Sequence, residues 1–176
     1  IAFLRLNGWK VEGSWPPLAK AVLIAAPHTS NWDGVYMLAA AGFYRIKLRW
    51  MGKQALTTGP LGPLVRWLGC VPIDRAGKND MVASMAANFA ERTDMILAIP
   101  PEGTRSISPE WKSGFYHIAH TAGVPLIVSV LDYGTKTIRL AATFATSGDY
   151  AADLALIRKH YEGVQGRHIG KFAHAD

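Results

Sequence analysis

The chain has 176 residues and a formal net charge of +6. This length is typical of one domain that buries its own hydrophobic core, so we expect a single domain over residues 1–176. Charged residues make up 18% of the sequence, below the roughly 25% usual for soluble domains, and 49% are hydrophobic. A basic chain of this kind favours an acidic partner: phosphate, an anionic membrane surface, an acidic carrier protein or nucleic acid.

Cys70 is the only cysteine, which excludes an internal disulfide. No apolar run approaches the roughly 18 residues needed to span a bilayer, and no signal peptide is visible. The chain starts at Ile1 and is amphipathic from its first residues. Two alternatives stay open: the chain is as it was made, or an upstream segment such as a membrane-facing helix has been removed.

Short apolar runs alternate with longer helical stretches. Strands are predicted at Val22–Ala26, Ile46–Met51, Cys70–Ile73, Met95–Ile99, Leu126–Leu131 and Ile138–Phe144. Helices are predicted at Trp32–Phe43, Leu61–Leu68, Asp80–Arg92, Ser113–Ala122 and Ala151–Tyr161. This alternation predicts an α/β fold, a three-layer α/β/α sandwich around a mostly parallel mixed sheet. From about Gly163 the chain is rich in Gly, His and Lys, and we expect a loose tail.

Polar side chains follow four of the predicted strands. They are His28, Lys53, the pair Asp74–Arg75 and the segment Glu102–Arg105. Open α/β sheets bind ligands at the carboxyl ends of their parallel strands. The sequence therefore predicts that these residues face one crevice.

The stretch APHTSNWDG, residues 26–34, has two interpretations. In the first, it only starts a helix, with Ser30 as N-cap and Asp33 completing a near capping box. In the second, Asp33 accepts a hydrogen bond from one ring nitrogen of His28 and leaves the other nitrogen free as a general base. The spacing alone does not decide between them.

The stretch IPPEGTRS, residues 99–106, also has two interpretations, which can hold together. Gly103 permits a tight loop whose backbone N–H groups face an anion, and the guanidinium of Arg105 matches phosphate oxygens. Alternatively, Glu102 and Arg105 form an internal ion pair that shapes the turn.

Together, HTSNWD and EGTRS resemble the glycerolipid acyltransferase family, which includes 1-acylglycerol-3-phosphate acyltransferases. That family is marked by a His-x4-Asp motif followed by Glu-Gly-Thr-Arg. The likeness extends through KQALTTGPLGPLVRWLGCVPIDRAG and AGVPLIVSV, and covers residues 8–131. It implies the following roles: His28 as general base, Asp33 as its orienting partner, Arg75 and Arg105 as phosphate contacts, and Glu102, Gly103 and Pro125 as supporting residues.

The chemistry of acyl transfer suits these residues. An alcohol attacks a thioester only when a base removes its proton, and histidine titrates in the right range. A thioester is already activated, so we expect no metal and no cofactor, with acyl-CoA or acyl carrier protein as co-substrate. The tetrahedral intermediate needs hydrogen-bond donors, for which backbone N–H groups around Thr29 and Ser30, or near Gly103, are candidates.

We therefore expect an acyltransferase that moves a fatty acyl group to the hydroxyl of a lysophospholipid, with 1-acylglycerol-3-phosphate favoured. The expected substrate-binding residues are Lys53, Arg75, Glu102, Gly103, Thr104, Arg105 and Lys112. We expect the protein to lie on the cytoplasmic face of an anionic membrane and not to bind nucleic acid. The alternatives are a different acceptor (another lysolipid, a glycolipid or an amino-acid lipid) or a non-enzymatic basic lipid- or nucleic-acid-binding module.

The stretch PLGPLVRWLG, residues 60–69, is too apolar for a freely solvated helix. Two interpretations remain open: it belongs to the core, or it lines an acyl-chain groove and touches lipid.

Overall fold

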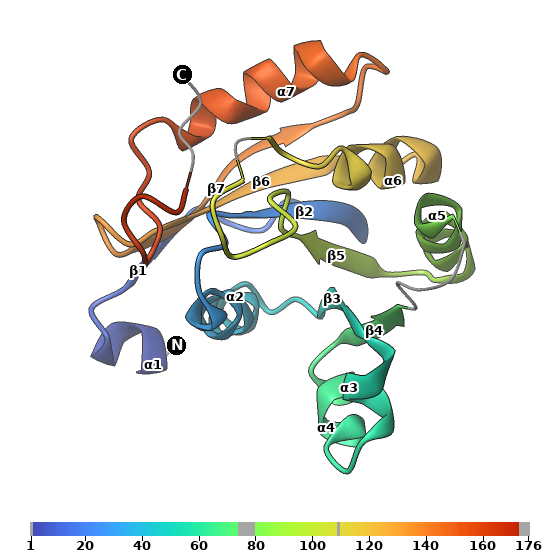
Figure 1. The fold of residues 1–176 in the computed structure, drawn as a ribbon, viewed down its shortest axis with the longest axis horizontal. Coiled ribbons are helices and arrows are strands. Elements are labelled where there is room, and N and C mark those ends of the chain that lie inside the picture. The colour runs from blue at the N-terminus through green and yellow to red at the C-terminus, as the bar shows by residue number, and fades with distance from the viewer. Residues whose placement is uncertain (1, 74–79, 109, 173–176) are drawn as a thin grey trace.

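The computed structural model describes residues 2–73, 80–108 and 110–172, and its centre is a mixed sheet (Figure 1). The strands are β1 (Lys10–Glu12), β2 (Lys20–Ala26), β3 (Leu48–Lys53), β4 (Cys70–Ile73), β5 (Met95–Ile99), β6 (Leu126–Asp132) and β7 (Thr137–Phe144). Their order is β1-β7-β6-β2-β5-β3-β4. Strands β6, β2, β5, β3 and β4 run parallel, whereas β7 is antiparallel to β6 and pairs in parallel with β1.

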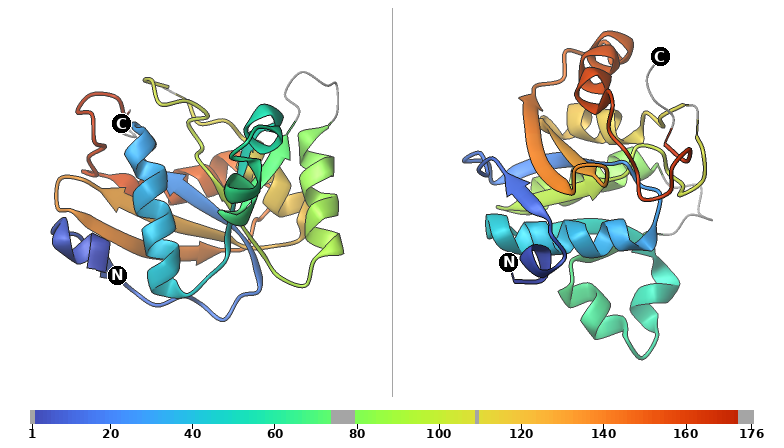
Figure 2. Two further views of the ribbon diagram at one scale, coloured as in Figure 1. Left: turned by 90° about the horizontal axis from the view of Figure 1, so that it is seen from below. Right: turned by 90° about the vertical axis from the view of Figure 1, so that its left-hand side faces the viewer.

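Helices cover both faces of this sheet (Figures 1 and 2). They are α1 (Ala2–Leu6), α2 (Asn31–Tyr44), α3 (Gln54–Thr58), α4 (Gly62–Trp67), α5 (Met81–Glu91), α6 (Gly114–Ala122) and α7 (Tyr150–Arg158), which continues into a 3-10 turn (Lys159–Tyr161). Helices α5, α6 and α7 cover one face, and α1 and α2 cover the other. The predicted α/β/α sandwich is confirmed. None of the helices in the described residues is long and apolar enough to cross a bilayer.

The alternation of side chains along the central strands explains the three layers. In β2, Val22 and Ile24 pack in the core under α5, α6 and α7, whereas Ala21 and Leu23 pack in the core against α2. Successive side chains of a strand point to opposite faces, so a strand covered on both sides must be apolar throughout. Strand β5 follows the same rule and is buried at every position.

The predicted strands and helices all form, with small shifts at their ends. Three further elements were not predicted: α1, β1 and α3. Each has five residues or fewer, too short for a periodic apolar pattern to develop. Strand β1 exists because β7 pairs with it, which is a contact between distant parts of the chain.

The C-terminal segment 163–172 differs from the expected loose tail. It has no regular secondary structure, but Val164 and Phe172 are buried in the main hydrophobic core with Tyr161. The composition of the tail did not reveal this packing because only these scattered apolar side chains anchor it.

Candidate active site

A groove of about 1130 Å³ opens where the carboxyl ends of β2, β3 and β5 meet. Of the residues predicted to form a site, these line it: His28, Asp33, Lys53, Gly103, Thr104, Arg105 and Lys112. They come from segments far apart in the sequence. The parallel strands bring them to one edge of the sheet, as expected for loops that follow such strands.

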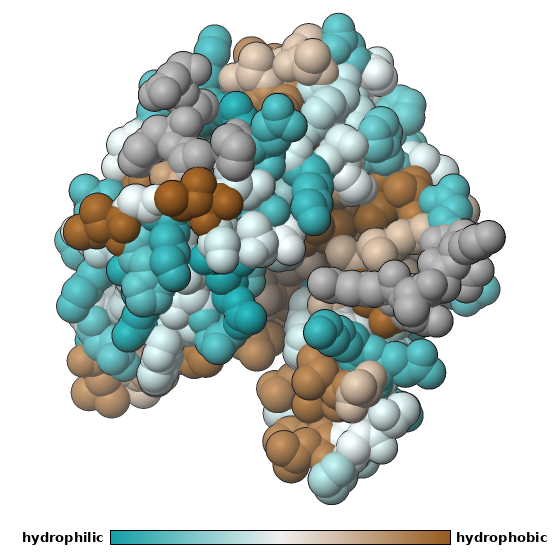
Figure 3. Space-filling view, viewed as in Figure 1, coloured by the Kyte–Doolittle hydropathy of each residue, from teal (hydrophilic) through white to brown (hydrophobic). Residues whose placement is uncertain are grey.

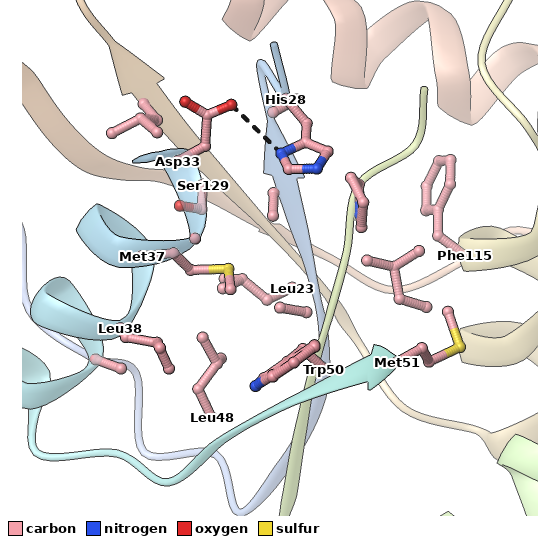
Figure 4. A pocket seen from close by; sticks show the side chains of 18 of the residues that line it. Leu23, His28, Asp33, Met37, Leu38, Leu48, Trp50, Met51, Phe115 and Ser129 are labelled. Carbon is pink, nitrogen blue, oxygen red and sulfur yellow. Dashed lines mark ion pairs between the residues drawn. The ribbon is translucent and has the colours of Figure 1, made fainter. Parts of the chain in front are cut away.

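The rest of the groove wall is mainly apolar (Figure 4). Side chains from β2, α2 and β3 form much of it: Leu23, Met37, Leu38, Leu48, Trp50 and Met51. His28 and Asp33 lie together at one end of this apolar row. A groove with one polar end and a long apolar wall suits an elongated amphiphile, whose polar group would lie at the His28 end.

His28 follows β2 directly, and Asp33 lies in the first turn of α2. The Nδ1 atom of His28 lies 3.3 Å from Oδ2 of Asp33, and the imidazole side chain is 27% exposed. This geometry places a proton on Nδ1 and turns the second ring nitrogen away from the carboxylate (Figure 4). The ring can therefore act as a base toward a molecule in the groove.

The carboxylate of Asp33 is buried and heavily hydrogen-bonded. Its Oδ2 atom accepts the backbone N–H groups of Thr29, at 2.6 Å, and Ser30, at 2.7 Å. Burial alone would raise the pKa of Asp33, but the hydrogen bonds from His28, Tyr133 and the two N–H groups together lower it. The group therefore stays ionised, which is the state that orients and stabilises an imidazolium.

The structure contains both the helix cap and the approach of His28 to Asp33 that residues 26–34 suggested. Ser30 is the N-cap of α2, and its hydroxyl accepts the N–H of Trp32 at 3.2 Å. Asp33 completes the capping box by accepting the N–H of Ser30. The same Oδ2 atom faces His28, so helix capping and histidine orientation depend on one oxygen.

Tyr133 is a site residue that the sequence did not reveal. It follows β6, and its hydroxyl donates to Oδ1 of Asp33 at 2.6 Å. Burial and this hydrogen bond raise the pKa of Tyr133, so its hydroxyl keeps its proton and remains a donor. Asp33 and Tyr133 are 100 positions apart, and no local pattern connects them.

Glu102 joins the loop after β5 to the loop after β2. Its side chain is 3% exposed, and Oε1 accepts the backbone N–H of His28 at 2.9 Å. Burial raises the pKa of Glu102 to about 7, against the opposing effect of hydrogen bonds and of His28. Its Oε2 atom is buried without a hydrogen-bond partner among the described residues. The ion pair suggested between Glu102 and Arg105 does not form; Glu102 contacts the backbone of His28 instead.

The loop after β5 presents Gly103, Thr104 and Arg105 to the groove. Gly103 has a φ of +64°, and a Cβ there would come within 2.8 Å of Cδ of Lys112. The absence of a side chain thus allows both the left-handed backbone and the close approach of Lys112. The N–H of Lys112 donates to the carbonyl of Pro101 at 2.8 Å, which holds this lysine beside the loop.

The C-terminal segment 163–172 packs against the loop after β2. A Cβ at Gly166 would come within 2.7 Å of Cγ2 of Thr29, and the N–H of His168 donates to the Thr29 hydroxyl at 3.4 Å. The guanidinium of Arg167 lies 5.2 Å from the ring centre of Trp32. The end of the chain thus helps to hold the histidine loop in place.

Two predicted residues remain to be placed. Arg75 lies outside the described residues. Pro125 lies at the start of β6, where its carbonyl accepts the N–H of Val22 at 3.0 Å. Because β2 and β6 are parallel, this is the edge of the sheet opposite His28, so Pro125 does not contact the groove.

The described residues contain no group of three or more His, Cys, Asp or Glu side chains that could hold a metal ion.

The site thus combines an imidazole–carboxylate pair with an apolar groove at the carboxyl edge of an α/β sheet, an arrangement suited to acid–base chemistry on a bound molecule. The chain belongs to the acyltransferase family, because the family described as Acyltransferase matches residues 10–131. This span runs from β1 to the penultimate residue of β6 and includes nearly all the residues of the groove.

Individual relatives agree with this assignment. A probable 1-acyl-sn-glycerol-3-phosphate acyltransferase of Mycoplasma pneumoniae is 34% identical over 133 residues, covering 71% of this chain and 50% of the relative. The 1-acyl-sn-glycerol-3-phosphate acyltransferase of Escherichia coli is 31% identical over 146 residues, covering 77% of this chain and 58% of the relative. The chain thus spans about half the length of the curated relatives it matches.

A crystal structure has a similar fold. The 1-acyl-sn-glycerophosphate acyltransferase PlsC from Thermotoga maritima matches with a TM-score of 0.60 at 17% identity, covering 89% of this chain and 72% of that chain. At this identity, the likeness concerns the fold alone.

The buried carboxyl of Glu102 predicts an unusual pH dependence of stability. Because folding raises the pKa of Glu102 from 4.5 to about 7, the native state binds more protons between these values, and the free energy of unfolding falls as the pH rises through them. We expect this loss to approach about 3 kcal/mol near neutral to mildly alkaline pH in the wild type and to be largely absent in Glu102→Gln. Urea unfolding at a series of pH values measures it.

Glu110→Gln is the matched control, because Glu110 is exposed and should leave the pH profile unchanged. The pKa of Asp33 is lowered from 3.8, so protonation of Asp33 changes the stability only at a pH below the range in which Glu102 titrates. Parallel profiles for the wild type and Glu102→Gln would contradict the prediction.

Tyr133→Phe removes one donor to Asp33. The pKa of Asp33 should rise, and the free energy of unfolding at neutral pH should fall by about 1–2 kcal/mol, since a buried hydrogen bond to a charged group is lost. NMR titration of 13C-labelled aspartate carboxyls and urea unfolding measure the two effects. In Tyr44→Phe, a hydroxyl that donates to the carbonyl of Glu12 is removed instead, and the pKa of Asp33 should not change. An unchanged pKa of Asp33 in Tyr133→Phe would contradict the hydrogen bond from Tyr133 to Asp33.

Proposed function

We propose that this protein transfers a fatty acyl group from acyl-CoA or acyl carrier protein to the hydroxyl of a lysophospholipid, with 1-acylglycerol-3-phosphate as the favoured acceptor. The observation that carries the proposal is the 3.3 Å approach of His28 Nδ1 to Asp33 Oδ2 at the head of an apolar groove. Membership of the acyltransferase family and the names of relatives at 31–34% identity support it.

The proposed reaction uses the two nitrogens of His28 differently. Asp33 holds the proton on Nδ1, and the second nitrogen removes the proton of the acceptor hydroxyl. The alcohol oxygen then attacks the thioester carbonyl, and a tetrahedral intermediate forms. As this collapses, the carbon–sulfur bond breaks, and the imidazolium returns its proton to the leaving thiolate. The ionised Asp33 stabilises the imidazolium between these two steps.

The developing oxyanion needs hydrogen-bond donors. The N–H groups of Thr29 and Ser30 already donate to Asp33, and that of Gly103 donates to the carbonyl of Pro100 at 3.2 Å. In the described part of the chain, the N–H groups of Thr104 and Arg105 have no acceptor, and both residues line the groove. We assign the oxyanion contact to these two N–H groups.

The cations around the groove suit a phosphate on the acceptor. Arg105 is exposed at the rim, and Lys53 and Lys112 line the same groove. A guanidinium can bind two phosphate oxygens at once, whereas each lysine acts as a point charge. We propose Arg105 as the main phosphate contact, with Arg75 as a second contact and the lysines in support.

The proposed substrates place the protein on a membrane. Lysophospholipids are membrane amphiphiles, and a net charge of +6 favours an anionic lipid surface. We propose that the protein binds peripherally at the cytoplasmic face, where acyl-CoA and acyl carrier protein are available. The thioester is already activated, so the proposed chemistry requires neither a metal nor another cofactor.

His28→Ala tests the proposed base. Because general base catalysis contributes about 10²–10⁴-fold, we expect kcat/KM for acyl transfer to fall by about a thousandfold while the protein remains folded. Mass spectrometry of products from mixed lysolipids and acyl-CoA measures turnover, and circular dichroism checks the fold. His117→Ala, an exposed histidine on α6, should retain full activity. A His28→Ala variant with most of the wild-type activity would rule out the mechanism.

Arg105→Ala tests the proposed phosphate contact. We expect kcat/KM for lysophosphatidate to fall at least about tenfold, while that for a phosphate-free acceptor such as monoacylglycerol changes little, since only the phosphate loses a partner. Lys10→Ala, an exposed cation on β1, should affect neither acceptor. An equal loss on both acceptors would remove the phosphate role from Arg105.

A further inference from the structure

Helices α3 and α4 form a hairpin, residues 54–67, that projects from the end of the sheet (Figures 1 and 2). The two short helices contact each other, β3 and β4, and are not covered by the other helices. The hairpin carries these exposed apolar side chains: Leu56 at 49%, Leu61 at 66%, Leu64 at 51% and Trp67 at 80%. The interpretation of residues 60–69 as core is therefore wrong for Leu61, Leu64 and Trp67.

The exposed apolar side chains of the hairpin lie close together on the surface. In Figure 3, hydrophobic residues gather over the projecting lobe that α3 and α4 form. A soluble domain normally exposes apolar side chains singly, and a gathered set marks a surface that binds a partner or a membrane. Leucine together with an exposed tryptophan is the composition found where proteins enter the interfacial layer of a bilayer.

The hairpin belongs to a stretch of the chain whose positive charge favours an anionic partner. Residues 34–73 contain no Asp or Glu, although the whole chain has 13 acidic residues. The same stretch contains the basic residues Arg45, Lys47, Arg49, Lys53 and Arg66. Lys53 and Arg66 lie at the two ends of the hairpin, and both are exposed. An apolar tip in a stretch of chain that carries five cations and no acidic residue complements a bilayer whose headgroups are anionic.

The hairpin also adjoins the groove. Leu56 and Lys53 line the same groove as His28. Figure 3 shows a hollow with apolar walls between the projecting lobe and the rest of the molecule. A lipid that left a bilayer beside the hairpin would therefore meet the groove beside Leu56 and Lys53.

We infer that the α3–α4 hairpin is the membrane-docking element of this protein: it inserts Leu61, Leu64 and Trp67 among the lipids of an anionic bilayer. In this position the groove opens toward the bilayer, and the acceptor enters beside Leu56. The identity of the entering lipid rests on the proposed function, whereas the docking surface does not.

The test is co-sedimentation of the purified protein with vesicles of phosphatidylcholine mixed with phosphatidylglycerol. Neither Leu64 nor Trp67 lines the groove, and both are exposed, so Leu64→Ser/Trp67→Ser should fold normally. We expect its partition coefficient to fall by about tenfold or more, because two apolar anchors are lost. Leu156→Ser/Ile169→Ser is the matched control: these side chains are 48% and 91% exposed outside the hairpin, and binding should remain at the wild-type level.

Two further measurements address charge and depth. Arg66→Gln should weaken binding to vesicles with phosphatidylglycerol and leave binding to pure phosphatidylcholine unchanged. Brominated phosphatidylcholine should quench part of the tryptophan fluorescence in the wild type, and that part should be absent in Trp67→Phe.

An assay with a water-soluble acceptor distinguishes failure of the docking surface from failure of the proposed function. On a short-chain lysophosphatidate kept monomeric in water, Leu64→Ser/Trp67→Ser should turn over at the wild-type rate. A wild-type protein inactive on every acceptor would refute the proposed function and leave the vesicle result standing.

Three outcomes would overturn the docking surface. One is wild-type vesicle binding by Leu64→Ser/Trp67→Ser, or an equal loss in the control pair. Another is a wild-type protein that is dimeric and a Leu64→Ser/Trp67→Ser variant that is monomeric but still binds vesicles. In that case the exposed side chains of the hairpin would bind a second copy of the chain. The third is intact vesicle binding with turnover lost only for the carrier-protein donor, which would assign the hairpin to that acidic protein.

Discussion

One carboxylate, that of Asp33, determines the geometry on which the proposed chemistry depends. It accepts the N–H groups of Thr29 and Ser30, faces Nδ1 of His28 and receives the hydroxyl of Tyr133. Each donor favours the ionised form, so the burial that would otherwise neutralise the group is overcome. The same contacts start α2 and fix the path of the chain after β2. The carboxylate that caps α2 therefore also orients the imidazole of His28.

A second buried carboxyl, that of Glu102, sets the position of the loop after β5. It binds the backbone of His28, so the loop that carries the proposed base and the loop that carries Arg105 are held together. Its raised pKa shows that the fold tolerates this group best when it is neutral. The groove then continues between α2 and β3 toward the α3–α4 hairpin. The α2 and β3 part of the apolar wall and the residues proposed to meet the bilayer therefore belong to one continuous stretch, residues 34–73, that contains no Asp or Glu.

The sequence predicted the regular elements well wherever their patterns were long. Fully apolar runs such as Met95–Ile99 indicate strands covered on both faces, and the helix predicted from Asp80 has this residue as its N-cap. The prediction was incomplete for α1, β1 and α3, which are stabilised by packing or pairing rather than by their own periodicity. It was wrong about the C-terminal segment, whose anchoring side chains, Val164 and Phe172, are too sparse to form a pattern.

For the candidate site, the sequence by itself determined the chemical groups and their order. His28, Asp33 and the Glu102–Arg105 segment could be selected because each follows a predicted strand and because their motifs together resemble those of a known family. The tertiary structure alone decided that Tyr133 donates to Asp33, that Glu102 binds backbone instead of Arg105, and that Pro125 lies at the opposite edge of the sheet. It also decided that Trp67 faces solvent rather than the core. These facts depend on which strands pair and in which direction, and contacts between distant segments leave no periodic trace in the sequence that forms them.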